Sequence, residues 1–413
     1  MHNDIRVMPP VPEVDSPKPT HNHFQTPEEV AAHDNVMQPE SPLQHESIPI
    51  AAAVKHKKQR KFWPPSRKQL IICSSVVLGL LLIGGGMFLA FRHNRPVTVN
   101  IPRKIVPPKA APVSNTVPST LTGLPVAPSV NQRPITAVMI ENLPPARPQS
   151  GLSQAGVVIE ALTEGGITRF IAFFQDQLAA NVGPIRSARP YYLDWALGFD
   201  APLAHVGGSP TALAEIPALG VKNLDYMFYP GYYTRITSRP APHNVYTSIS
   251  RLMSLEASLG WTSSSFTGWA RKADSPSKNP NATNIDFTLS YSTYNVSYSY
   301  SPSTNSYNRS EGGAPQIDAN TGKQISPKVV IGMVVPWSQG PMDSSNAYYS
   351  VYQTTGSGQA YVFQDGTVTV GQWNKPTPQS PLTFTTQSGQ PLKLNAGQTW
   401  ITALASSSEI RYN

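Results

Sequence analysis

The chain has 413 residues, a formal net charge of +8 and one cysteine. The charge is uneven, because residues 51–130 hold 12 basic residues and no acidic one, whereas residues 131–413 hold 18 Lys and Arg against 16 Asp and Glu. The larger part of the chain is nearly neutral, so its bulk charge argues against nucleic acid as a partner. Since this part has no cysteine, disulfides, thiolate nucleophiles and zinc–thiolate sites are excluded there.

Residues 70–91, "LIICSSVVLGLLLIGGGMFLAF", form an uncharged apolar segment. Its 22 residues can span a hydrocarbon core of about 30 Å as a helix, which predicts one transmembrane helix. Seven basic residues precede it within fifteen positions and four follow it. By the positive-inside rule, we expect a cytoplasmic N-terminus, extracytoplasmic C-terminal domains and contact with membrane lipids. Cys73 lies inside the span, and a plain membrane residue is favoured over a lipidated one.

Two segments beside this span have the composition of unfolded chain. Residues 1–69 are rich in Pro, His, Glu and Gln and poor in large apolar residues, which predicts a disordered cytoplasmic tail with a basic juxtamembrane band. The histidines of the tail have no ligand spacing, so a solvated tail is favoured over a metal site. Residues 92–130 are interrupted by prolines and predict a semi-rigid linker.

Residues 131–265 read as an α/β domain. The segment 135–142 predicts a buried strand, and 157–176 predicts two strands joined at Gly165-Gly166. If Glu164 and Ile167 flank this turn, then Glu160, Glu164 and Arg169 share one face. The two carboxylates then allow acid–base chemistry, but a structural ion cluster is favoured because Arg169 would keep both ionised.

Two helix starts follow in this domain. Pro190 begins "PYYLDWALGF", and Ser209-Pro210 follows the short strand 201–206 and two glycines, as an N-cap and first helical residue do. Helix N-termini attract anions, and guanidinium groups fit phosphate or carboxylate. If the preceding strands are parallel neighbours, both starts meet at one sheet edge and bring together these candidate ligand-binding residues: Arg186, Ser187, Arg189, His205, Gly207, Gly208 and Ser209.

The alternative is that Arg186 and Arg189 pair with Asp194, Asp200, Glu141 or Glu160 and brace the loops. A later loop, "RPAPHN", adds Arg239, His243 and Asn244 to the candidate ligand-binding residues. His205 and His243 are the only histidines of the folded part, and either one near Ser187 or Ser209 would suit a His-dependent hydrolase or transferase. No motif for a metal, phosphate loop or dinucleotide is present, so we expect no cofactor and no metal.

The last part of the chain is rich in predicted strands. Residues 266–285 are polar and predict a linker, and residues 286–413 predict a β-rich domain. The alternation of Val296, Tyr298 and Tyr300 before a polar turn predicts a hairpin. The expected class is therefore α+β or α/β, with one transmembrane helix, an extracytoplasmic α/β domain and a β-rich domain.

Several motifs resemble a known family. "RPITAVMIENLPPARPQSGLSQAGVVIEALTEGGITRFIAFFQ", "VGPIRSARPYYLDWA", "HVGGSP" and "RPAPHNVYTS" look like the N-terminal domain of the YerB-like bacterial envelope proteins, a family with a two-part domain of unknown function. "GSGQAYVFQDGTVTVGQW" and "PLTFTTQSGQPLKLNAGQTWITAL" resemble its C-terminal domain. The resemblance implies an envelope location, where members are commonly lipoproteins, and supplies no reaction or catalytic residue.

Three functions remain open from the sequence. The first is a membrane-anchored envelope protein that binds an anionic ligand, such as a wall polymer or a lipid-linked phosphate. The second is an envelope hydrolase or transferase with a His base. The third is a scaffold whose aromatic loop at 226–233 docks an envelope protein.

Overall fold

The computed structural model describes residues 115–342 and 348–413. The predicted tail, the predicted transmembrane helix 70–91 and the first part of the linker lie outside these residues. Within the described part of the chain, the helices are all too short or too polar to cross a membrane.

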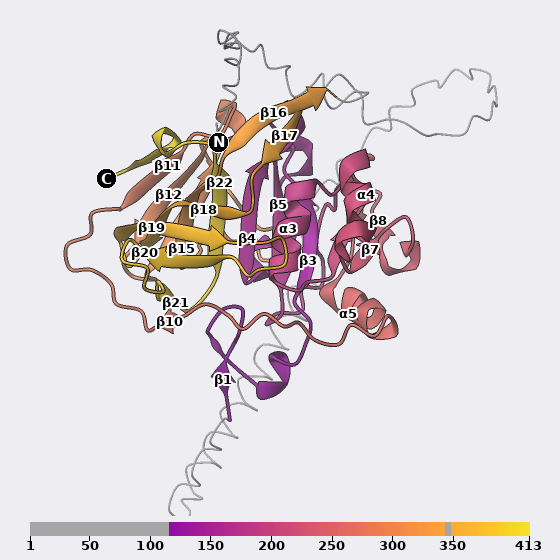
Figure 1. Cartoon of the computed structure of the whole chain (residues 1–413), viewed down its shortest axis with the longest axis horizontal. Coiled ribbons are helices and arrows are strands. Elements are labelled where there is room, and N and C mark those ends of the chain that lie inside the picture. The colour runs from indigo at the N-terminus through magenta and orange to yellow at the C-terminus, as the bar shows by residue number, and fades with distance from the viewer. Residues whose placement is uncertain (1–114, 343–347) are drawn as a thin grey trace, which may run out of the picture. The chain divides into compact units, whose positions relative to one another are not determined.

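A mixed ten-stranded sheet runs through the described residues, in the order β20-β19-β18-β15-β22-β4-β5-β3-β6-β7 (Figure 1). Two groups of strands are parallel, β15-β22-β4 and β3-β6-β7, and the other neighbours are antiparallel. Both halves of the chain supply strands to this sheet, because β22 pairs with β4. The strands are β3 (Thr136–Glu141), β4 (Val157–Leu162), β5 (Thr168–Phe174), β6 (Leu203–His205), β7 (Asn223–Asp225), β15 (Val329–Val334), β18 (Gly356–Gln364), β19 (Thr367–Lys375), β20 (Thr383–Thr386) and β22 (Thr399–Leu404).

Each face of this sheet is covered by a different layer. All six residues of β3 are buried, and Ala137 and Met139 join one hydrophobic cluster while Val138 and Ile140 join another. This is the pattern of a strand with both faces covered. The first face packs against α3 (Pro190–Gly198) and α4 (Pro210–Leu219).

The second face packs against α5 (Ile249–Ser258) and a five-stranded antiparallel sheet, β14-β13-β12-β11-β23. The fold is therefore α+β and mostly β, and the predicted hairpin of alternating tyrosines is confirmed as β12 and β13. The strands are β11 (Asn284–Phe287), β12 (Val296–Ser301), β13 (Ser306–Glu311), β14 (Ala314–Pro315) and β23 (Ile410–Tyr412).

Parts of the two segments expected to be linkers pack against the core. Residues 117–126 form a small hairpin, and its loop residue Leu121 is fully buried in the cluster on the α3 side. Phe266 and Trp269 stack with Phe199 at the end of α3. These segments carry β1 (Val117–Pro118), β2 (Pro125–Val126) and β10 (Arg271–Lys272), and β10 pairs with β21 (Leu394–Asn395).

The expected register of the β4–β5 hairpin is wrong by one residue. Leu162 pairs with Thr168 and Ala161 with Arg169, so the loop has three residues between its flanking pair, Glu164 to Gly166. Gly165 and Gly166 both have positive φ, which a three-residue turn of this kind accommodates. Since a one-residue slip exchanges the faces, Glu160 lies on the face opposite Arg169.

Candidate functional site

The starts of α3 and α4 lie side by side. Ala188 bridges to Gly208, with its N–H 3.0 Å from the carbonyl oxygen of Gly207 and its own carbonyl 3.2 Å from the N–H of Ser209. Ser209 caps α4, since its side chain accepts a hydrogen bond from the N–H of Ala212 at 3.2 Å. The two helix starts are therefore adjacent, as expected, but α3 follows an irregular segment that bridges to Gly208 rather than a regular strand of the sheet.

A buried ion group lies beneath the start of α3. Arg189 donates to both carboxylate oxygens of Glu164, one of them at 2.7 Å, and the Arg169 guanidinium lies 3.9 Å from the same carboxylate. Burial alone would raise the pKa of Glu164, but the two arginines outweigh it and lower that pKa to about 2. Arg189 therefore does pair with a carboxylate of its own fold, although Glu164 was not among the expected partners.

A second buried group surrounds Glu141. The Nε atom of Arg186 lies 3.1 Å from Glu141 Oε1, and Nδ1 of His243 lies 2.9 Å from Glu141 Oε2. Glu141 is one of the partners that the structural alternative expected for Arg186. The two ion groups lie close together, because Arg169 interacts with the guanidinium groups of both. Burial and repulsion from Arg189 and Arg186 lower the pKa of Arg169, against attraction to Glu164.

A cavity of about 480 Å³ opens beside Arg189 and Ser209, and we call it the helix-side cavity. One wall is formed by α3 and α4, and the other by the hairpin of β16 (Trp337–Met342) and β17 (Tyr348–Tyr352). Tyr352 packs on Tyr191 with ring centroids 5.0 Å apart, which fixes the hairpin against α3. The lining residues are Arg189, Pro190, Tyr191, Asp194, Ser209, Thr211, Glu215, Ala218, Leu219, Pro341, Tyr349, Ser350, Val351, Tyr352 and Pro378.

Two acidic side chains, Asp194 and Glu215, face the helix-side cavity. Burial raises the pKa of Asp194, against a hydrogen bond from Thr354 and attraction to Lys375. Burial and repulsion from Asp194 both raise the pKa of Glu215. The negative charge in this cavity therefore titrates at a higher pH than isolated carboxyl groups would.

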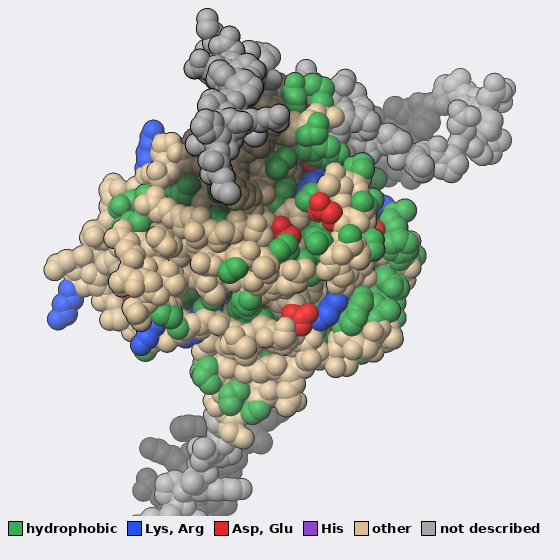
Figure 2. All heavy atoms as spheres, viewed as in Figure 1, with side chains coloured by type: hydrophobic (Ala, Val, Ile, Leu, Met, Phe, Trp, Pro, Cys, Tyr) green, Lys and Arg blue, Asp and Glu red, His purple; other side chains and the backbone are tan. Residues whose placement is uncertain are grey.

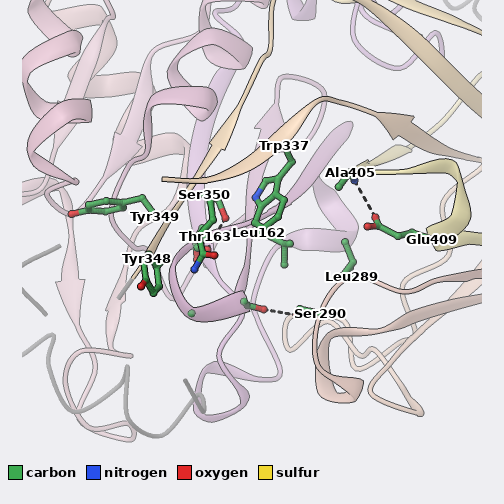
Figure 3. Close-up of a pocket in the computed structure, with 13 residues that line it drawn as sticks. Leu162, Thr163, Leu289, Ser290, Trp337, Tyr348, Tyr349, Ser350, Ala405 and Glu409 are labelled. Atoms are coloured by element: carbon green, nitrogen blue, oxygen red, sulfur yellow. Dashed lines mark hydrogen bonds between the residues drawn. The ribbon is translucent and has the colours of Figure 1, made fainter. Parts of the chain in front are cut away.

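A second cavity, of about 290 Å³, lies on the other side of β17, and we call it the turn-side cavity (Figure 3). It shares Tyr349 and Ser350 with the helix-side cavity. Gly165 and Gly166 of the β4–β5 turn line it, and Glu164 of the same turn pairs with Arg189, which lines the helix-side cavity. Its lining residues are Leu162, Thr163, Gly165, Gly166, Leu289, Ser290, Trp337, Gln339, Tyr348, Tyr349, Ser350, Ala405 and Glu409.

The remaining predicted site residues hold loops together. His205 is fully buried, with Nδ1 2.7 Å from the Gly207 carbonyl and Nε2 2.9 Å from Asn223 Oδ1, so both ring nitrogens are engaged. Arg239 donates to the carbonyls of Ala146 and Pro148. Asn244 Oδ1 accepts from Arg235 at 2.8 Å, and the carbonyl of Ser187 accepts from Arg169 at 2.7 Å.

Sequence reasoning missed Asp194 and Glu215 as cavity residues, and it missed Trp337, Tyr349 and Glu409 entirely. The position of Asp194 could have been recognised from the sequence, because this acidic residue interrupts the otherwise apolar run of α3. The other residues carry no local signal, since their partners come from distant strands.

The surface of the molecule has an apolar region near α4. Figure 2 shows hydrophobic side chains gathered over the side that carries α4, with few charges on the face drawn. Met227 and Phe228, in the expected docking loop, are 66% and 69% exposed, and Leu213 on α4 is 42% exposed.

The fold is that of an α+β protein in which strands from both halves of the described residues form one sheet, with two cavities beside the β16–β17 hairpin. Residues 121–262 match the family model described as "Protein of unknown function (DUF3048) N-terminal domain", and residues 285–401 match the corresponding C-terminal domain. The chain belongs to this family, which confirms the YerB-like resemblance.

One relative is the Bacillus subtilis (strain 168) protein named "Putative lipoprotein YerB". It is 32% identical over 286 residues, which cover 68% of this chain and 84% of the relative. The crystal structure of YerB protein from Bacillus subtilis is similar, with a TM-score of 0.65 and 28% identity. That match covers 72% of this chain and 99% of the YerB chain.

Proposed function

We propose that this protein is a membrane-anchored cell-envelope protein that binds an anionic ligand, a wall polymer or a lipid-linked phosphate, in the helix-side cavity. The apolar segment 70–91 and the name of the YerB relative support an anchored location outside the cytoplasm. Protease treatment of intact protoplasts tests this location. Residues 115–413 should be digested and the N-terminal tail protected, and the opposite pattern would contradict the orientation.

The observation that carries the ligand proposal is the meeting of two helix starts at one cavity that Arg189 lines. The N-terminus of a helix has a partial positive charge, and α3 and α4 begin next to each other at Ala188 and Gly208. Arg189 and Ser209, at these two starts, both line the cavity. The helix starts favour an anionic group beside them, whereas negative charge on Asp194 and Glu215 in the same cavity opposes it.

Binding of poly(glycerol phosphate) to the full-length protein in detergent tests the proposal by calorimetry. The double variant E164Q/R189Q removes the cation at the cavity together with its carboxylate partner, and Arg169 keeps its bond to the Ser187 carbonyl. We expect its affinity to fall about tenfold or more, as for a lost charge-assisted hydrogen bond.

The matched control is Arg251→Gln on α5, whose side chain is exposed and bonds to Thr234. It should bind the polymer as the parent protein does. Equal affinity in E164Q/R189Q, the control and the parent protein would overturn the proposal.

A second candidate function, an envelope hydrolase or transferase, is favoured by one contact. The bond from His243 Nδ1 to Glu141 orients the ring as a general base requires and directs Nε2 elsewhere. His205 is unsuited, because both its nitrogens are engaged. Turnover of envelope polymers that disappears in H243Q would support this function, whereas turnover that survives in H243Q would exclude it.

A further inference from the structure

We propose that the turn-side cavity is a binding subsite for a neutral saccharide unit. The inference rests on the proposed function, because it assigns the sugar part of an anionic envelope polymer to the cavity next to the anion-binding one. Its volume of about 290 Å³ lies at the small end of ligand sites, which fits one or two sugar rings.

The cavity has an aromatic wall. Trp337 projects from β16 above Leu162, between Ser350 and Thr163 on one side and Ala405 and Glu409 on the other (Figure 3). Tyr348 stands at the rim and is 42% exposed. Aromatic faces are electron-rich, so they attract the polarised C–H face of a pyranose ring while burying it from water.

Polar groups of the same cavity match sugar hydroxyls. The Nε1 atom of Trp337 is buried and has no acceptor among the residues that the structure describes, so it offers a donor. The carboxyl group of Glu409 accepts from the N–H of Ala405 at 3.0 Å and retains further lone pairs as acceptors.

The hydroxyl groups of the cavity are held in place by the β4–β5 turn. Ser350 donates to the carbonyl of Thr163 at 2.9 Å, and Ser290 donates to the carbonyl of Gly166. Both hydroxyl oxygens therefore keep their acceptor lone pairs for a ligand. A few polar groups at fixed positions on an apolar wall are typical of a specific small-ligand site.

The charges of the cavity restrict the ligand. Glu409 is the charged residue of the lining, and no Lys or Arg is among the lining residues that the structure describes. Burial raises the pKa of this carboxyl group, and the same burial, together with any charge on Glu409, disfavours an anionic ligand beside it. A neutral or amino sugar is therefore favoured over an anion. A proline-rich peptide, which also docks on aromatic residues, is disfavoured because it offers few donors for the remaining lone pairs of the hydroxyl and carboxyl groups.

Titration of the full-length protein with neutral oligosaccharides, chitotetraose and cellotetraose, tests the subsite. Binding is followed by tryptophan fluorescence and saturation-transfer NMR. We expect at least one of these sugars to bind, and Trp337→Phe and Glu409→Gln each to weaken it by about tenfold, or about 1.4 kcal/mol.

Matched controls separate a local effect from loss of folding. Trp269→Phe removes another partly buried indole, one that donates to the Leu382 carbonyl, and Glu215→Gln alters a carboxyl group of the other cavity. Both should leave sugar affinity unchanged, and the melting temperature of each of the four variants shows whether a change in affinity is local or reflects unfolding. If Trp337→Phe has a lower melting temperature than the parent protein, the sugar affinity of Glu409→Gln is the deciding measurement.

The inference is overturned if neither sugar binds, if binding is unchanged in Trp337→Phe and Glu409→Gln, or if a proline-rich peptide binds there instead. Its failure is distinguishable from failure of the proposed function. Poly(glycerol phosphate) without sugar substituents reports on the helix-side cavity alone, and the neutral oligosaccharides report on the turn-side cavity alone.

Discussion

The guanidinium group of Arg189 donates to both carboxylate oxygens of Glu164 and so joins the start of α3 to the β4–β5 turn. The two side chains are about one-tenth exposed. Arg189 lines the helix-side cavity, and Thr163 and Gly165, the neighbours of Glu164, line the turn-side cavity.

Arg189→Ala should lower the free energy of unfolding by about 3–5 kcal/mol at pH 7, because it leaves a buried carboxylate without its main partner. The double variant E164Q/R189Q should lose less, since neither charge remains. Urea denaturation measures both values. Equal losses in the two variants would show that the charges contribute little.

The ion pair of Glu164 and Arg189 should also make the stability of the fold decrease at acidic pH. The pKa of Glu164 is lowered from 4.5 to about 2 in the folded protein, so its contribution is present above pH 4.5 and is lost as the pH falls from 4.5 toward 2. Unfolding followed by circular dichroism between pH 2 and 6 should show that the stability of Glu164→Gln decreases less at low pH than the stability of the parent protein. Parallel curves for the two proteins would contradict this.

Glu256 on α5 should have the opposite pH dependence. Burial raises its pKa to about 7, against a hydrogen bond of 2.7 Å from Thr136. The folded state keeps a proton that the unfolded state loses, so stability falls as the pH rises from 4.5 to 7, by about 3 kcal/mol. Glu256→Gln should therefore be the more stable protein at pH 8 and nearly equal to the parent at pH 4. Chemical denaturation at the two pH values measures the difference, and a pH-independent difference would refute it.

Ser209→Asp should separate stability from anion binding. Aspartate caps a helix as well as serine does and interacts favourably with the helix dipole, so the melting temperature should hold. Its negative charge at the helix-side cavity should weaken poly(glycerol phosphate) binding severalfold. Ser209→Ala should have the opposite pattern. It should lower the free energy of unfolding by about 1 kcal/mol and change the affinity little. Unchanged binding in Ser209→Asp would place the ligand elsewhere.

Binding of poly(glycerol phosphate) should strengthen as the pH is lowered. The pKa values of Asp194 and Glu215 are both raised, so their negative charges are neutralised at a higher pH than those of isolated carboxyl groups and then repel phosphate less. The variant D194N/E215Q should bind more tightly than the parent protein at pH 7 and should have a flatter pH profile by calorimetry. A profile identical to that of the parent would exclude these carboxyl groups as its cause.

Much of the local structure follows from short stretches of sequence. The predicted helices begin at Pro190 and Pro210, because proline fits the first helical turn and Ser209 supplies the cap. The strands of β12, β13, β18 and β19 follow from alternation and turn residues. The register of the β4–β5 hairpin did not follow, because Glu164 joins the turn to reach Arg189, a partner 25 residues away.

The sequence by itself determined the family, the class of fold and the positions of most helices and strands. It also predicts the transmembrane helix and its orientation. These features depend on composition and on neighbouring residues. Only the tertiary structure decided that β22 and β4 unite both halves in one sheet, and that Glu160 pairs with Arg309 across 149 positions. It also decided that Trp337 and Glu409 share a cavity with the β4–β5 turn, because buried charges and cavity walls take their partners from whichever distant strands packing brings together.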